Sequence, residues 1–113
     1  MIQKEEITML HRVVFLTQNC VCRIVPGHIV VGVADRISFS AIGSAVTVYF
    51  PNPNILEESE GRKIGSLVTI NPGHPVVFTV VGSSTSSYPY TAYCSATNTF
   101  ATGGSEGEII IQT

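Results

Sequence analysis

Apolar residues along this chain either alternate with polar ones or run in short blocks, and β-branched types dominate both patterns. A two-residue period is typical of a strand with one buried face. Alternation is clearest in residues 36–40, 45–50 and 88–94, and shorter apolar blocks predict further strands at 20–25, 29–31, 64–70, 75–81 and 107–112. Residues 7–16 show some helical spacing, but their run Val-Val-Phe-Leu favours a strand. In this register Val46, Val48 and Phe50 should form one inward face with Ile37 and Phe39.

Turn signals separate these segments. Pro26-Gly27, Gly43-Ser44 and Asn71-Pro72-Gly73 are turn sequences, and residues 51–54 and 82–87 read as loops. The charged stretch 55–63 reads as a surface loop with room for one helical turn. About seven to eight short strands, with no internal repeat and no linker, predict a single all-β domain over residues 1–113, a Greek-key β-sandwich.

Composition narrows the classes of function. The chain has 113 residues and a net charge of -2, which disfavours nucleic-acid binding. With 44% hydrophobic and 12% charged residues it is not a disordered chain. No apolar run approaches the roughly 20 residues that cross a bilayer. The first residues are acidic rather than signal-like, so we expect a cytoplasmic protein or an exported one whose signal has been removed.

Three segments resemble cupredoxins. They are Tyr93-Cys94-Ser95 followed by Glu108-Ile109-Ile110-Ile111, the stretch Ala34-Asp35-Arg36-Ile37-Ser38-Phe39, and Val46-Thr47-Val48-Tyr49-Phe50. The resemblance spans residues 24–112 and implies a copper thiolate at Cys94, a first histidine on the strand 45–50, and a second histidine and a methionine after the cysteine. Val46 occupies the first histidine position, residues 95–102 hold neither His nor Met, and no histidine follows His74. We therefore expect no functional blue-copper site and no cofactor.

The three cysteines leave several readings open. Cys20 and Cys22 are two apart, so on a strand both would face the same way. Together with Cys94 they could ligate a soft metal, Cys94 could form a disulfide with one of the pair, or all three could pack as small apolar residues. The histidines His11, His28 and His74 fall in different elements, and no serine is paired with a base. We therefore expect a protein that is not an enzyme.

Charge is distributed unevenly. From Ile64 to Ser105 there is no Asp, Glu, Lys or Arg, although the chain has 6 basic and 8 acidic residues. An exposed surface built from this segment suits a contact surface better than open solvent, with Tyr88, Tyr90 and Tyr93 as interface candidates. The leading hypothesis is a self-associating or partner-binding module, a homo-oligomer in its simplest form a closed dimer. The alternative is a soft-metal-binding or electron-transfer protein using Cys94 with Cys20 and Cys22.

Overall fold

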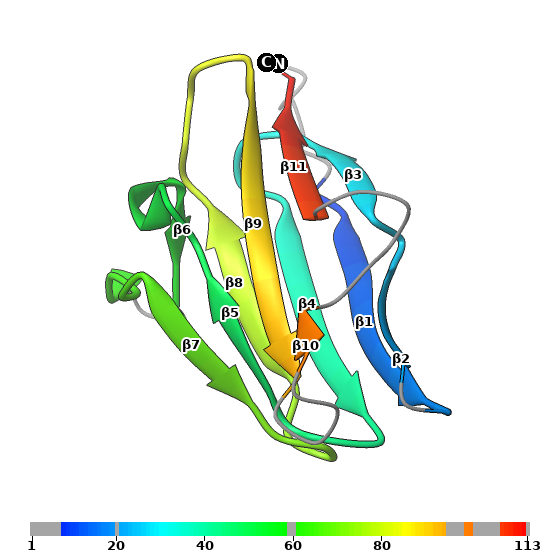
Figure 1. Cartoon of the computed structure of the whole chain (residues 1–113). Coiled ribbons are helices and arrows are strands. Elements are labelled where there is room, and N and C mark those ends of the chain that lie inside the picture. The colour runs from blue at the N-terminus through cyan, green and yellow to red at the C-terminus, as the bar shows by residue number, and fades with distance from the viewer. Residues whose placement is uncertain (1–7, 20, 59–60, 95–98, 101–106, 113) are drawn as a thin grey trace, which may run out of the picture.

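The strands form two sheets packed face to face in a computed structural model (Figure 1), which describes residues 8–19, 21–58, 61–94, 99–100 and 107–112. The first sheet has the order β2-β1-β4-β8-β6 and the second the order β3-β11-β9-β5-β7, with β10 attached to β9. The strands are β1 (Leu10–Gln18), β2 (Val21–Val25), β3 (His28–Val31), β4 (Arg36–Ile42), β5 (Val46–Tyr49), β6 (Leu56–Glu57), β7 (Leu67–Ile70), β8 (Val76–Val80), β9 (Ser86–Cys94), β10 (Thr99–Phe100) and β11 (Gly107–Ile111), with one 3-10 turn, η1 (Pro53–Ile55). The prediction of an all-β sandwich is confirmed.

The chain changes sheet at nearly every step. From β2 to β9, each strand lies in the sheet opposite to the one before it. Strand neighbours are therefore mostly distant in sequence, and two pairs, β1 with β4 and β3 with β11, are parallel. Among the described residues the helical content is the three-residue turn η1, which is far too short to span a membrane.

Alternating side chains fill the space between the sheets. Val46, Val48 and Phe50 are at most 3% exposed, and Ile37 and Phe39 are fully buried. The rings of Phe39 and Phe50, which come from opposite sides of the core, lie 5.7 Å apart. The prediction that these five residues point inward is confirmed. They do not share one face, however, because β4 and β5 lie in different sheets and their side chains meet across the core.

Several boundaries differ from the prediction. The charged stretch contains the two-residue strand β6 next to η1, and β10 lies where no strand was predicted. Neither is long enough to show a two-residue period, so periodicity had no signal for them. The strand expected over 7–16 is present as β1, starting at Leu10 and extending to Gln18.

Candidate functional site

Cys94 and Val46 lie side by side at one end of the second sheet. Cys94 is the last residue of β9 and Val46 the first of β5, and the antiparallel register pairs them directly. Both are buried, at 0% and 1% exposed. A histidine at position 46 would stand beside the Cys94 sulfur, but the valine that occupies this position has no atom that can ligate a metal.

A disulfide joins Cys94 to Cys22. Cys22 lies on β2 in the first sheet, so the bond connects the two sheets. The Cα atoms are 6.4 Å apart, and the two cysteines are 72 positions apart in sequence. Cys22 is available for this bond because β2 turns Cys22 and Ile24 inward and Val21, Arg23 and Val25 outward. Of the three readings of the cysteines, the structure has the disulfide for Cys22 and Cys94, while Cys20 lies outside the described residues.

A bonded sulfur is not a thiolate, and the thiolate is the form that ligates soft metals. Within the described ranges, no three His, Cys, Asp or Glu side chains gather as a metal site would require. Residues 95–98 and 101–106, where the resemblance would place the remaining copper ligands, are not among the described residues.

Two of the three histidines bond to carboxylates. Neither of these pairs lies next to the disulfide in the register of the strands. His11 on β1 lies 2.9 Å from Asp35 through Nε2, and His28 on β3 lies 3.0 Å from Glu108 through Nδ1. Hydrogen bonds from Ser87 and His28 lower the pKa of Glu108. His74 closes the turn after β7, its backbone N–H donating to Asn71.

Asp35 is the most embedded of these acids, at 8% exposed. Its carboxylate accepts hydrogen bonds from the backbone N–H of Met9 at 3.0 Å, from that of Gly32 at 2.9 Å and from His11. Burial by itself would raise the pKa of Asp35, but these hydrogen bonds and the nearby imidazole outweigh it and lower the pKa. The arrangement fastens the start of β1 to the loop before β4, which is a structural role.

Comparison with solved structures shows which known fold this architecture resembles. A reduced mutant form of amicyanin aligns with a TM-score of 0.52 at 11% identity over 88% of this chain and 81% of that chain. A purple cupredoxin from Nitrosopumilus maritimus aligns with a TM-score of 0.52 at 11% identity over 90% of this chain and 99% of that chain. The fold is cupredoxin-like. No family model and no curated protein matches the sequence.

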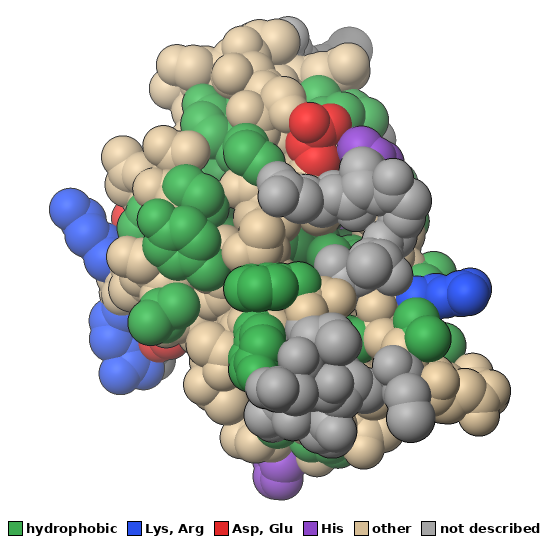
Figure 2. Space-filling view, in the orientation of Figure 1, with side chains coloured by type: hydrophobic (Ala, Val, Ile, Leu, Met, Phe, Trp, Pro, Cys, Tyr) green, Lys and Arg blue, Asp and Glu red, His purple; other side chains and the backbone are tan. Residues whose placement is uncertain are grey.

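The outward side of the second sheet of this cupredoxin-like sandwich is the other candidate site. We call the outward side chains of β7, β5, β9 and β10 the aromatic face; they are Thr47, Tyr49, Leu67, Thr69, Thr91, Tyr93 and Phe100. Tyr49 is 46%, Leu67 67% and Phe100 65% exposed, and the rings of Tyr93 and Phe100 meet edge to face at 5.4 Å. Figure 2 shows hydrophobic side chains gathered over these strands, with Lys and Arg only at the margins of the view.

The three tyrosines proposed for an interface have different positions. Tyr93 lies on the aromatic face. Tyr90 is 1% exposed and packs against Phe15, Phe39 and Phe50, so it belongs to the core and is withdrawn as a surface candidate. Tyr88 is half-buried against the core.

Sequence reasoning missed Tyr49, Leu67 and Phe100. Tyr49 could have been found, because the alternation of 45–50 places its side chain on the other face of the strand from the inward-pointing Val48. Leu67 and Phe100 could not, since one lies in an edge strand and the other in a two-residue strand.

Proposed function

We propose that this protein is a non-enzymatic cupredoxin-like module that self-associates through the aromatic face. The observation that carries the proposal is the exposure of Tyr49, Leu67 and Phe100 on a surface to which β7, β5, β9 and β10 contribute no charged side chain. The neighbouring strand β11 carries Glu108 at its border, opposite Pro89. Soluble monomers rarely leave a contiguous apolar surface of this kind open to water, and aromatic residues are enriched at protein interfaces.

The position of β7 adds a second reason. It is an edge strand of the second sheet, and its two outward residues, Leu67 and Thr69, are uncharged. Natural proteins usually protect such an edge with charged residues, proline or a covering element. A contact across β7 and β5 would cover the exposed side chains and the edge together.

The segment from Ile64 to Ser105, which has no charged residue, forms only part of the aromatic face. Its strands β7, β9 and β10 contribute to the aromatic face, whereas β8 lies in the other sheet. Strand β5 precedes the segment yet sits between β7 and β9, so the face is assembled by the topology rather than by one continuous stretch.

The alternative of a soft-metal or electron-transfer site at Cys94 with Cys20 or Cys22 has less support. The sulfurs of Cys22 and Cys94 are bonded to each other, and Val46 offers no ligand beside them. The histidines of β1 and β3 are engaged with Asp35 and Glu108.

Light scattering after size exclusion, at concentrations from low to high micromolar, tests the proposal. We expect a mass above the 12.1 kDa of one chain. Leu67→Lys should give the monomer, because it places an ammonium group within the contact. Val33→Lys is the matched control, since Val33 is also exposed, at 47%, but lies in the loop between β3 and β4. A wild-type protein that is monomeric throughout the range contradicts the proposal.

A further inference from the structure

The opposite side of the sandwich carries arginines among exposed apolar residues. We call the outward side chains of β2, β1, β4 and β8 the arginine face, after Arg12, Arg23 and Arg36. The exposed apolar residues among them are Leu10, Val21, Val25, Ile42 and Val77. The register places Arg23 beside Leu16 and Arg36 beside Leu10. Arg23 and Arg36 are therefore each paired with an aliphatic residue, whereas Arg12 is paired with Ser38 of β4.

Acidic groups are nearly absent from this face in the described strands. The exception is Glu57 on β6, which is separated from Arg36 by Thr79 of β8. The other described acids lie elsewhere. Glu58 is near Arg62 in the loop after β6, Asp35 is bonded to His11, and Glu108 is on the second sheet. The arginine face thus has cations whose partners its own strands do not supply.

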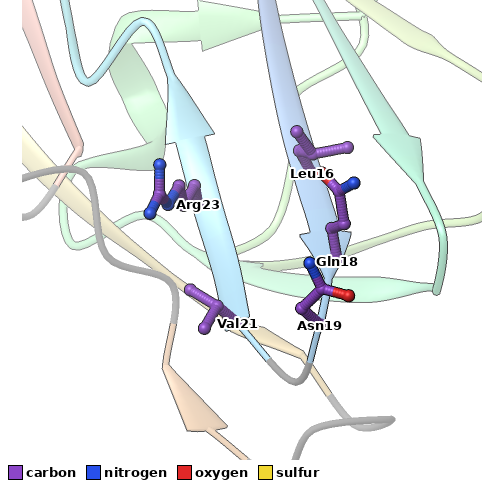
Figure 3. Close-up of a pocket in the computed structure, with 5 residues that line it drawn as sticks. All are labelled: Leu16, Gln18, Asn19, Val21 and Arg23. Carbon is purple, nitrogen blue, oxygen red and sulfur yellow. The ribbon is translucent and has the colours of Figure 1, made fainter.

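A hollow of about 190 Å³ opens on the arginine face, where β1 turns into β2. Figure 3 shows Leu16 and Gln18 from β1 and Val21 and Arg23 from β2 around it, with Asn19 at the turn. Its lining therefore combines two aliphatic side chains with a guanidinium group and two amides. An aromatic ring suits such a lining, because its edge and face contact the aliphatic walls while its π system attracts the cation.

The aromatic face supplies aromatic rings, which the strands of the arginine face do not present outward. It presents the rings of Tyr49, Tyr93 and Phe100, and Phe100 is 65% exposed. It also bears no cation that would repel arginines. Two arginine faces packed together would set like charges against each other, and two aromatic faces packed together would leave the arginines without partners.

We propose that the partner of the aromatic face is the arginine face of a second copy of this chain, with an exposed ring of one copy seated in the hollow of the next. This inference rests on the proposed function. The contact is heterologous, because two different surfaces meet. The two faces lie on opposite sides of the sandwich, so each copy can bind two neighbours. Assembly then continues beyond a dimer, into a ring or an open stack.

Mixing two defective variants tests the inference. Leu67→Lys disables the aromatic face and Arg23→Glu disables the arginine face, and both residues are exposed, so neither change should disturb folding. Each variant alone should be monomeric. Mixed in equal amounts, they should form a species of twice the monomer mass, because one intact aromatic face and one intact arginine face remain. Arg62→Glu, a charge reversal in the loop after β6, is the matched control and should assemble like the wild type. Val21→Lys provides a second variant at the hollow.

The outcomes separate the two proposals. If the wild type assembles and Arg23→Glu and Val21→Lys assemble equally well, the heterologous contact is wrong while self-association stands. If each variant is monomeric but their mixture stays monomeric, the heterologous contact is also wrong. A monomeric wild type overturns the proposed function, and this inference with it. A mixture that reaches twice the monomer mass and goes no further supports the inference.

Discussion

Asp35 shows how one carboxylate can hold two segments together. Its oxygens accept hydrogen bonds from the backbone N–H of Met9, just before β1, and from that of Gly32, in the loop before β4. The third bond comes from His11, the second residue of β1. Asparagine has nearly the same shape but only one oxygen acceptor, so it can satisfy only part of this set.

We expect Asp35→Asn to lower the free energy of unfolding at pH 7 by about 1–3 kcal/mol, the range for a buried hydrogen-bonding group that loses partners. The pKa of Asp35 is lowered in the folded protein, so its stabilising effect is complete above the unfolded value of about 3.9 and is lost as the pH falls through the folded value. The difference between variant and wild type should therefore shrink in strong acid. Urea denaturation at pH 7 and at low pH measures it, with the exposed Glu58→Gln as control. A difference that stays constant with pH contradicts the assignment.

Val48 tests the register of β5. Val48→Asp would place a carboxylate in the core, where the side chain is fully buried, and should cost about 3–5 kcal/mol. Thr47→Asp introduces the same group one position away on the outward side and should cost much less. Thermal unfolding of the two variants distinguishes them. Similar melting temperatures would mean that β5 is placed in the wrong register.

Single residues also show where sequence reasoning reached its limit. The sequence analysis named both Tyr90 and Tyr93 as interface candidates, although a two-residue period places them on opposite sides of β9. Alternation could not say which side faces the core, because both sides of this strand carry aromatic or β-branched residues. The position of Cys94, which shares the inward side with Tyr90 and bonds to Cys22, resolves the orientation in the structure.

At the scale of elements, the disulfide is the one covalent cross-link between side chains of the two sheets among the described residues. It closes a loop over a sequence separation of 72 residues, between β2 and β9. Removing it should lower the free energy of unfolding by about 2–4 kcal/mol, because the unfolded chain regains the freedom that the loop restricts.

Chemical denaturation of the double variant Cys22→Ala, Cys94→Ala measures this effect. The comparison is best made in a Cys20→Ala background, so that the third cysteine cannot form a different bond. The same loss should follow when the parent in this background is denatured under reducing conditions. An unchanged midpoint in both experiments would show that the two sulfurs are not bonded in the folded protein.

Elements differed in how far the sequence could predict them. Strands β4, β5 and β9 alternate over several residues, and their positions were predicted well. The pairing of strands was not predictable from periodicity, since from β2 to β9 successive strands occupy opposite sheets. The choice of Cys22 over Cys20 as the partner of Cys94 was likewise open, because both fall at the same parity of one predicted strand.

For the whole molecule, the chemistry associated with the cupredoxin-like fold can be tested directly. We expect Cu(II) added to the protein, with the disulfide intact or reduced, to produce no intense blue charge-transfer band. Blue copper requires two imidazoles beside the thiolate, and Val46 stands where the register would place one of them. Absorption spectroscopy with Cu(II) is the measurement. An intense visible band that disappears in Cys94→Ser would contradict the expectation.

The parallel pairing of β3 with β11 has a consequence for how the molecule is made. His28 and Glu108, which are partners in that pairing, are 80 residues apart. The strands of the first sheet all lie between Leu10 and Val80, so that sheet can assemble early on a ribosome. The second sheet cannot be completed until β11 has been synthesised. Until then, β3 and the first half of β9 lack β11, the strand that pairs with both of them. Such late, long-range pairing makes folding slow and exposes strand edges meanwhile, so this protein should be most vulnerable to aggregation during its own synthesis.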